Sequence, residues 1–507
     1  MLHVVACRKY LTNKSRRGIL QALLEIYMRD FIVVYLNGKR HELRGEQAFM
    51  TLSDFLRYEK SLTGTKVVCS EGDCGACTVL VANVHRLEND ELDYEPVNSC
   101  ISFMNVLDGC HIVTVEGLEE KDQGLNAVQE SMVEHHGAQC GFCTPGFVCA
   151  MNAGIESHLK KGNEIDEKRI KNSLTGNLCR CTGYKSIIES GLNVDLEKFE
   201  PLTKKYPSKK IIDDLLEISK KSVSLKYKER SFFLPTTFKE ALELQSKNSS
   251  TIISGASDLG VLHNKRGLRP ASMIGLHNVN ELYEIRKEKD YAFIGARVNL
   301  HEIEDQLGGE FQEFSKMIQI FASPQIKNRA TLIGNVANAS PIGDSIPFLL
   351  VMDALIVIES TQGIREVNIN DFYKGYKDLD LGKDELIKGI KVPYLLEKES
   401  MRLYKVSNRK DMDISIVTFA AKMTLEENSV ADISLAVGGV GPIVLRPKDT
   451  ENALVGQIFS KDKFENAANI LKNEVTPIDD VRGSAKFRRV LSKNLLMKFF
   501  TEAQGVQ

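Results

Sequence analysis

The sequence predicts an α+β protein of several domains, and three observations lead to this fold class. At 507 residues the chain is too long for one ordinary hydrophobic core, so roughly three to four domains are expected. Strand-forming residues and a hairpin turn come first, and a stretch with helical spacing of apolar residues follows. Strands and helices then mix to the end of the chain, which favours an α+β class over a purely helical or purely stranded one.

The first folded domain is expected over residues 28–117. Residues 31–36 are rich in strand formers, and Asn37-Gly38 is typical of a two-residue hairpin turn. A short helix follows, and returning strands are expected over residues 78–84 and 111–115. Two hairpin strands, a helix and returning strands make a compact α+β unit.

The next domain, over residues 118–195, is expected to be a small helical bundle. Its four helices are predicted over residues 127–135, 145–159, 168–174 and 185–192. The lysine-rich residues 196–228 are predicted to form a linker, because they offer little that must be buried. An α+β domain in two parts is expected over residues 229–398, and a last α/β domain over residues 399–507.

Composition and charge limit the classes of function. The net charge of -2 gives no electrostatic reason to expect nucleic acid or an anionic membrane surface. No uncharged apolar run approaches the ~18 residues of a membrane helix, so no membrane span is expected. Residues 1–27 are basic and nearly free of acid, and an unstructured extension is the simplest interpretation.

All the cysteines lie in the first part of the chain. There are eleven, and none follows Cys181. Disulfide frameworks belong to small secreted domains, whereas this chain has no convincing secretion signal. A cytoplasmic location and metal ligation are therefore expected.

The first set of cysteines is Cys69, Cys74, Cys77 and Cys100, with the C-x4-C-x2-C…C spacing of a plant-type [2Fe–2S] centre. A loop this short places three thiolates around one side of a cluster, and the distant cysteine supplies the fourth. Glycines inside the loop let the backbone approach closely and direct N–H groups at the sulfides. Zinc sites usually pair two C-x-x-C hooks, so this spacing favours the cluster.

The second set is Cys140, Cys143, Cys179 and Cys181. Each pair precedes a predicted helix, whose dipole favours thiolate. Taken alone, C-x-x-C with C-x-C also fits zinc, but its place after a plant-type centre favours a second [2Fe–2S] cluster. Free buried thiols are expected for the remaining cysteines, which are Cys7, Cys110 and Cys149.

A possible phosphate site lies over residues 252–260. No G-x-G-x-x-G follows a predicted strand, so a Rossmann site is not supported. Instead, a β-branched strand ends in the small-residue turn Ser254-Gly255-Ala256-Ser257, whose N–H groups could hold a pyrophosphate. A strand followed by a glycine turn is common, so this signal is weak by itself.

The cysteine segments resemble the iron–sulfur half of the molybdenum hydroxylases, a family that includes xanthine dehydrogenase, aldehyde oxidase and carbon monoxide dehydrogenase. The resemblance lies in residues 69–77, in QCGFCTPGF (139–147) and in GNLCRCTGY (176–184). It implies a β-grasp ferredoxin-like domain followed by a four-helix [2Fe–2S] bundle. It also implies that the first cluster lies nearer the flavin and the second nearer the molybdenum cofactor, whose pterin Gln139 would touch.

The later segments 321–331, 333–344 and 405–414 resemble the FAD-binding part of the same family. The resemblance implies a two-part α+β FAD-binding domain, a C-terminal flavoprotein domain and the following FAD contacts: Ile252, Ile253, Ser254, Gly255, Ala256, Ser257, Asp258, Leu259, Phe321, Thr331, Gly334, Asn335, Asp344, Ile387 and Lys405. Gly255-Ala256-Ser257 stands where the family often has Gly-Gly-Thr. Ordinary packing is the alternative for Phe321 and for Met412, where some relatives carry an acid.

The resemblance covers about residues 28–496 and includes no molybdenum-binding region. The chain most resembles the small, iron–sulfur/FAD subunit of two-subunit bacterial xanthine dehydrogenases. It implies a large molybdenum-binding partner, a heterotetramer of two small and two large chains, and electron flow from hypoxanthine or xanthine to NAD+. The same role for an aldehyde or N-heterocycle hydroxylase is the alternative. A zinc-stabilised scaffold is the non-enzymatic alternative.

Overall fold

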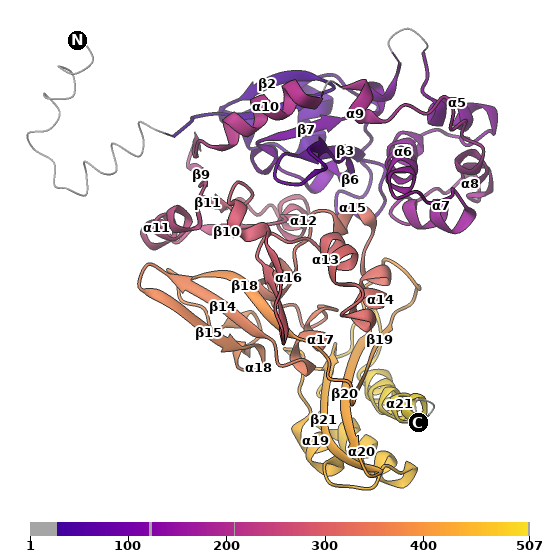
Figure 1. Ribbon diagram of the computed structural model, residues 1–507, viewed down its shortest axis with the longest axis vertical. Coiled ribbons are helices and arrows are strands. Elements are labelled where there is room, and N and C mark those ends of the chain that lie inside the picture. Colours follow the sequence, from indigo (N-terminus) through magenta and orange to yellow (C-terminus); the bar gives the residue numbers. More distant parts are fainter. Residues whose placement is uncertain (1–27, 121–123, 207, 505–507) are drawn as a thin grey trace, which may run out of the picture.

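The computed structural model describes residues 28–120, 124–206 and 208–504 (Figure 1). The extension expected over residues 1–27, including Cys7, lies outside this part of the chain. Four groups of elements follow one another in sequence; in Figure 1 the first two lie side by side at the top, the third lies below them and the fourth lies at the bottom. The expected α+β multidomain class is confirmed.

The first domain is built on a mixed sheet in the order β2-β1-β7-β3-β6. Its strands are β1 (Ile32–Leu36), β2 (Lys39–Leu43), β3 (Thr78–Asn83), β6 (Glu95–Asn98) and β7 (Cys110–Val113). Every residue of β1 is buried, and β1 pairs in parallel with β7 at the centre of the sheet. Asn37 and Gly38 both have positive φ, as a hairpin turn of this kind requires. Short helices α3 (Gly45–Ala48) and α4 (Leu52–Asp54) and the small hairpin β4 (Leu87–Glu88) and β5 (Glu91–Leu92) complete the domain.

The second domain is the expected bundle of four helices, beside the first domain in Figure 1. The helices are α5 (Ala127–Glu134), α6 (Thr144–Lys160), α7 (Glu167–Ser173) and α8 (Lys185–Leu192). Asn126 and Gln129 form a capping box at the start of α5, and Pro145 occupies the first turn of α6, where its missing N–H is not needed. Helix α6 packs along β3, so the two domains share an apolar interface.

The predicted linker over residues 196–228 is wrong. The structure has α9 (Leu202–Lys205), α10 (Ser208–Ser219) and strand β8 (Val223–Tyr227) there. Ile211, Ile212 and Leu215 are buried against the first domain, and the Tyr35 hydroxyl donates to the Asp214 carboxylate at 2.8 Å. Lys209 and Lys210 lie on the exposed side of the amphipathic helix α10, and its other face is part of the core.

Two sheets with covering helices form the third region. The first has the order β10-β11-β9-β8, with β9 (Arg230–Leu234), β10 (Thr251–Ile253) and β11 (Ser272–Gly275). The second has the order β12-β13-β18-β14-β15, with β12 (Ile285–Lys287), β13 (Tyr291–Gly295), β14 (Leu355–Ser360), β15 (Gly363–Asn368) and β18 (Leu386–Pro393). The helices are α11 (Phe238–Asn248), α12 (Ser257–Arg266), α13 (Leu300–Leu307), α14 (Gln312–Phe321), α15 (Pro324–Lys327), α16 (Leu332–Asn338), α17 (Ile346–Val351) and α18 (Ile369–Phe372). The pair β16 (Tyr373–Gly375) and β17 (Asp378–Leu379) follows.

The first and third regions share one hydrophobic core. Val34 and Leu36 of β1 lie in the same cluster of buried side chains as Val223, Leu225 and Phe232 of β8 and β9. A buried ion pair of 2.7 Å between Arg29 and Asp108 reinforces this interface, and the Asn278 amide donates to Asp108 at 3.0 Å. The sheet of the first domain is therefore covered by the sheet that leads to α12.

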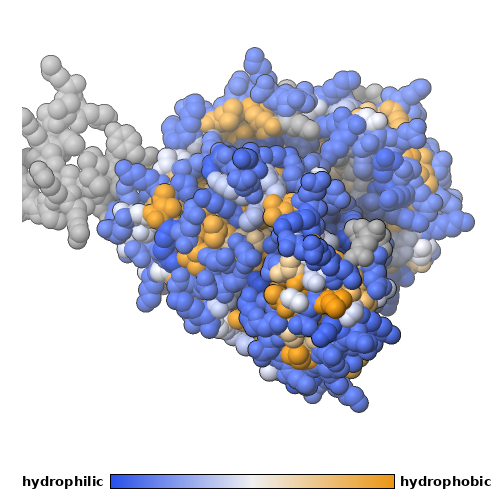
Figure 2. All heavy atoms as spheres, turned by 60° about the horizontal axis from the view of Figure 1, so that its bottom comes forward, coloured by the Kyte–Doolittle hydropathy of each residue, from blue (hydrophilic) through white to orange (hydrophobic). Residues whose placement is uncertain are grey.

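The last region is an antiparallel sheet of β19 (Glu399–Val406), β20 (Val417–Glu426) and β21 (Ser429–Gly438). Helices α19 (Lys448–Leu454), α20 (Lys461–Glu474) and α21 (Ala485–Gln504) pack with it. In Figure 2, which brings this end forward, the surface is largely hydrophilic with separate apolar patches. No helix within the described residues is long and apolar enough to cross a membrane.

Candidate functional site

The first cysteine loop connects the short helices of the first domain to β3. Gly72 and Gly75 have φ of +78° and +67°, where a side chain would be strained. A Cβ on Gly75 would also lie 2.1 Å from the carbonyl oxygen of Gly176 in the second domain. Glycine at this position therefore lets the loop turn around a small volume and touch the neighbouring domain.

The four thiols of the first set converge, as the spacing predicts. Cys77 and Cys100 are each 2% exposed, whereas Cys69 and Cys74 are half-buried. Contacts with the Cys100 and Cys74 thiols lower the pKa of Cys69, and contact with Cys100 lowers the pKa of Cys77, whereas the same contacts raise the pKa of Cys74 and of Cys100. Deprotonated thiols are the form that binds iron.

The thiols of the first set contact one another in series: Cys69 contacts Cys74 and Cys100, and Cys100 also contacts Cys77. A [2Fe–2S] cluster takes two thiolates at each of two irons. Four thiols gathered in one place can supply these ligands, and the assignment of the set to a cluster stays a prediction.

The second set lies where two helices of the bundle begin. Cys143 is the N-cap residue of α6, and Cys181 lies shortly before α8. The Sγ atoms of Cys140 and Cys181 are 3.5 Å apart, and the Cys179 and Cys143 thiols also contact each other. A hydrogen bond from the backbone N–H of Phe142 is the main cause of the lowered pKa of Cys140. The four thiols of the second set thus form two contacting pairs, Cys140 with Cys181 and Cys143 with Cys179.

The second set opens to the surface of this chain. Cys140 and Cys181 are exposed, and Phe142 beside them has 49% of its surface exposed. Leu178 and Tyr184 are also exposed, at 40% and 37%. Gln139 precedes Cys140 and is exposed as well, so its assignment to the pterin stays a prediction.

A hydrogen-bonded junction joins the two cysteine sets. The backbone N–H of Leu178, which precedes Cys179, donates to the carbonyl oxygen of Cys74 at 3.0 Å. The Asn177 amide donates to the Gly75 carbonyl at 2.9 Å, and the Gln325 amide from α15 donates to Asn177 at 2.8 Å. Sequence reasoning missed Asn177 and Gln325, because the contact between them spans 148 residues and no local pattern signals it.

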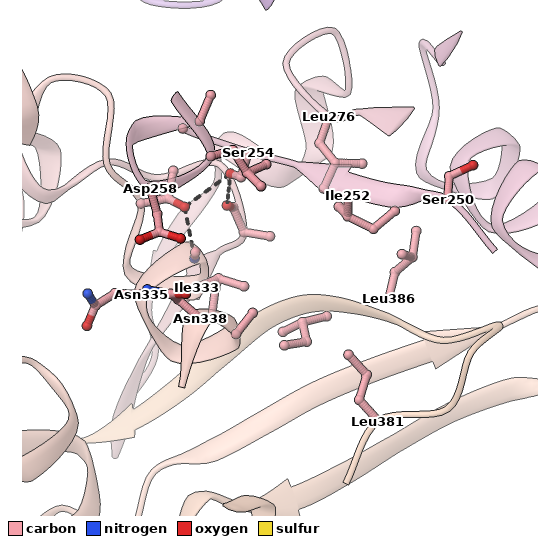
Figure 3. A pocket seen from close by; sticks show the side chains of 18 of the residues that line it. Ser250, Ile252, Ser254, Asp258, Leu276, Ile333, Asn335, Asn338, Leu381 and Leu386 are labelled. Carbon is pink, nitrogen blue, oxygen red and sulfur yellow. Dashed lines mark hydrogen bonds between the residues drawn. The ribbon is translucent and has the colours of Figure 1, made fainter. Parts of the chain in front are cut away.

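A cavity of about 450 Å³ lies between α12, α16 and β18 (Figure 3). Most of the residues predicted to contact FAD line it, namely Ile252, Ser254, Gly255, Ala256, Ser257, Asp258, Leu259, Thr331, Gly334, Asn335 and Ile387. Apolar residues missed by sequence reasoning complete the lining, among them Leu276, Leu381 and Leu386. Ile253 is buried and does not line the cavity.

The turn before α12 is shaped to admit an anion. Ala256 has a φ of +64° and is the N-cap residue of α12, so the free N–H groups of the first helical turn lie at the cavity. A Cβ on Gly255 would lie 2.0 Å from the carbonyl oxygen of Arg329, which accounts for the glycine. The Ser254 hydroxyl bonds with the Thr331 hydroxyl at 3.1 Å, which fixes the turn against α16. These features suit a diphosphate.

The remaining predicted FAD residues form a second polar group. Lys405 and Asp344 are 1% and 5% exposed and pair at 2.6 Å, and Ser415 donates to the same carboxylate. Burial raises the pKa of Asp344, and the Lys405 ammonium opposes that rise. The ammonium also lies 5.8 Å from the centre of the Phe321 ring. Ser415 was missed by sequence reasoning, because its partner Asp344 lies 71 residues away.

The loop 407–413 lies beside this polar group. Met412 has a φ of +53°, and its carbonyl oxygen accepts a hydrogen bond from Arg409 at 3.1 Å. Asp413 accepts from the Arg409 backbone N–H at 2.9 Å. The loop is therefore held by its own polar contacts, and the role of the Met412 side chain stays a prediction.

Comparisons with known families divide the chain as its structure does. Residues 34–105 match a "2Fe-2S iron-sulfur cluster binding domain", and residues 114–191 match a "[2Fe-2S] binding domain". Residues 225–395 match the "FAD binding domain in molybdopterin dehydrogenase". Residues 402–503 match the "CO dehydrogenase flavoprotein C-terminal domain".

Similar proteins include xanthine dehydrogenases. Xanthine dehydrogenase 1 of Arabidopsis thaliana is 29% identical over 92% of this chain and 39% of its own length. Xanthine dehydrogenase of Emericella nidulans is 29% identical over 93% of this chain and 38% of its own. The chain thus spans about two fifths of the length of these curated relatives.

Among solved structures, a carbon monoxide dehydrogenase from Hydrogenophaga pseudoflava that lacks the Mo-pyranopterin moiety of the molybdenum cofactor has a TM-score of 0.51 and 24% identity. The match covers 53% of this chain and 94% of that chain. Quinoline 2-oxidoreductase from Pseudomonas putida 86 has a TM-score of 0.50 and 24% identity over 54% of this chain and 96% of that chain. At these identities the likeness concerns the fold alone.

The fold and the matched domains define an iron–sulfur flavoprotein with two [2Fe–2S]-binding domains and an FAD-binding domain. In this order the four regions are similar to the iron–sulfur and flavin domains that these models describe, including the FAD-binding domain of molybdopterin dehydrogenases.

Proposed function

We propose that the chain is the electron-transfer subunit of a xanthine dehydrogenase and that it passes electrons from a molybdenum-binding partner to NAD+. The observation that carries this proposal is the order of contacts between the three sites. Leu178 of the second cysteine set touches Cys74 of the first, and α12 connects the first set to the FAD cavity. The exposed second set is thus one end of the series, and the FAD cavity is the other.

The chain's own residues hold and separate the three sites. Cys69, Cys74, Cys77 and Cys100 ligate the first cluster, and Cys140, Cys143, Cys179 and Cys181 ligate the second. The turn at Ser254–Ser257 and the first turn of α12 bind the FAD diphosphate, and Asp344 with Lys405 fixes its other end. When bound, the clusters carry single electrons and FAD exchanges electron pairs. The buried thiols Cys77 and Cys100 exclude water from the first cluster.

The partner is a large molybdenum-binding subunit, in a heterotetramer of two small and two large chains. The exposed rim of Phe142, Leu178 and Tyr184 around Cys140 and Cys181 supports a docking surface there. Gln139 at this rim contacts the pterin of the partner's cofactor.

A second candidate is the same electron-transfer role for an aldehyde or N-heterocycle hydroxylase. The fold shared with quinoline 2-oxidoreductase favours it. Both candidates assign the same roles to the residues of this chain, because the substrate pocket lies in the partner.

The test separates the two half-reactions. The purified, cofactor-loaded chain should oxidise NADH with an artificial dye and should not act on xanthine. Adding the partner should restore urate formation coupled to NAD+ reduction. Xanthine oxidation by the chain alone would overturn the division between subunits, and coupled oxidation of an aldehyde or N-heterocycle but not of xanthine would favour the second candidate.

A matched pair of variants tests the order of the sites. Cys140→Ser should abolish the coupled reaction and leave NADH–dye turnover largely intact, because the second set is upstream of the FAD cavity. Cys149→Ser changes a buried thiol of α6 outside both sets and should preserve both activities. Equal loss of both activities in folded, flavin-replete Cys140→Ser would contradict the order.

A further inference from the structure

Helix α12 touches two sites at once. Ser257, Asp258 and Leu259 in its first turn line the FAD cavity, and Asp258 is seen at the cavity in Figure 3. The whole helix is about 15 Å long, at about 1.5 Å per residue, and it leads from the cavity towards the first cysteine set. Its second half contacts both cysteine-bearing segments of that set.

The central contact is made by Asn264. Its side-chain Nδ2 donates to the carbonyl oxygen of Ser70 at 2.9 Å and to that of Cys100 at 2.8 Å. Ser70 directly follows Cys69, so one amide group joins the loop that carries three thiols to the separate segment that carries the fourth. Both hydrogens of the amide are used, and both acceptors are backbone atoms.

Packing holds this end of α12 close to the thiols. A Cβ on Gly260 would lie 2.2 Å from the carbonyl oxygen of Ile101, so the helix and the Cys100 segment are in backbone contact. Val261 packs against Cys77, Cys100 and Ile101. Lys265 and Glu71 form an ion pair of 3.3 Å at the surface.

We propose that Asn264 is a positioning residue for the first cluster and that α12 couples the geometry of this cluster to occupancy of the FAD cavity. A ligand at the first turn fixes the helix, and Asn264 passes that restraint to the Ser70 and Cys100 carbonyls. The spacing of Cys69 and Cys100 then depends on whether the cavity is filled. This inference rests on the proposed function, since it requires both cofactors.

The test compares Asn264→Leu and Asn264→Asp with Asn452→Leu. Leucine keeps the size of the side chain and removes both donors, and aspartate keeps its shape and sets a carboxylate against two carbonyls. Asn452 is an exposed asparagine of α19, far from the thiols in sequence, and serves as the matched control. The readout is the electron paramagnetic resonance spectrum of the reduced protein with and without FAD, and the second cluster is an internal standard in the same molecule.

In the parent and in Asn452→Leu, restoring FAD to flavin-free protein should shift and sharpen the first cluster's signal. In both Asn264 variants this response should be lost, and a chelator should remove iron from the first cluster at least about tenfold faster, as loss of an outer-shell partner typically does. The second signal should not change. If one Asn264 variant does not fold, the FAD response of the other variant tests the coupling.

An unchanged FAD response in a folded Asn264 variant would overturn the coupling and leave the proposed function standing. Loss of both clusters together in both variants would also overturn it, because a positioning role is confined to the first set. A parent protein with no iron and no flavin would instead overturn the proposed function, and this inference with it.

Discussion

The two cysteine sets each bring four thiols together, but in opposite surroundings. The first lies inside the molecule, where Cys77 and Cys100 are buried and α12 and α15 of the FAD region close over the loop. The second lies where α6 and α8 begin, and its Cys140 and Cys181 face solvent. A buried site depends on distant parts of the chain, whereas an exposed site depends on its own helices and is open to a partner.

Single cysteine substitutions should have the largest effect on the iron content of the chain. A loaded chain should hold about four irons, as two [2Fe–2S] clusters imply. Cys74→Ser should remove one cluster's paramagnetic signal, and Cys143→Ser the other's. Cys110→Ser and Cys149→Ser should spare both, and loss of either signal in these controls would show that the assigned ligands are wrong.

The rate at which each thiol is alkylated should report the difference in burial between the two cysteine sets. In iron-free protein that keeps its circular dichroism, an alkylating reagent should modify Cys140 and Cys181 at least ~10³-fold faster than Cys77 and Cys100, whose reaction requires local opening. Mass spectrometry of timed samples gives the rates. Cys110 and Cys149 are also fully buried and should react slowly. Equal rates at all sites would mean that the first set is not enclosed.

The close contact between the first domain and the helical bundle depends on Gly146. A Cβ on Gly146 in α6 would lie 2.2 Å from the carbonyl oxygen of Gly75, so Gly146→Ala should destabilise the protein by about 2–3 kcal/mol as overpacking does. Gly309→Ala has open space around its Cβ and is the control, with a change within about 0.5 kcal/mol. Chemical denaturation measures both. Similar stability of the two variants would contradict the tight junction.

Two buried groups, one in each domain, should contribute to the pH dependence of stability with opposite sign. Burial lowers the pKa of His111 in the first domain to about 3, and its Nε2 accepts from the Gly38 N–H at 3.0 Å. The folded state therefore binds fewer protons at His111, and the contribution of this group to stability should fall by about 2 kcal/mol as pH drops from 6.5 to 5.

Burial raises the pKa of Glu156 in the second domain to about 6. The folded state binds an extra proton there, so this contribution is present below pH 4.5 and is lost as pH rises through 6, by up to ~2 kcal/mol. Hydrogen exchange followed by domain across this pH range checks both signs. His111→Gln and Glu156→Gln should flatten the respective profiles, and unchanged profiles would show that other groups govern the acid response.

The elements that the sequence predicts correctly are those indicated by patterns within a short stretch of residues. The strand at β1, the four helices α5–α8 and the convergence of the cysteines follow from short-range patterns. The linker prediction failed because the lysines were weighed by composition, while Ile211 and Leu215 are spaced to form a buried helix face. Gln325 and Asn264 act on partners 148 and 194 residues away, and a single sequence carries no sign of such pairs.

The core shared by β1, β8 and β9 has a consequence for folding. Val34 of the first domain and Phe232 of the FAD region lie in one cluster of buried side chains, so each region supplies part of the other's core. A fragment that ends near residue 195 would expose an apolar sheet face and would tend to aggregate. Where both regions are present in one chain, as here, they should therefore unfold in one cooperative transition, and loss of either should make the other easier to degrade.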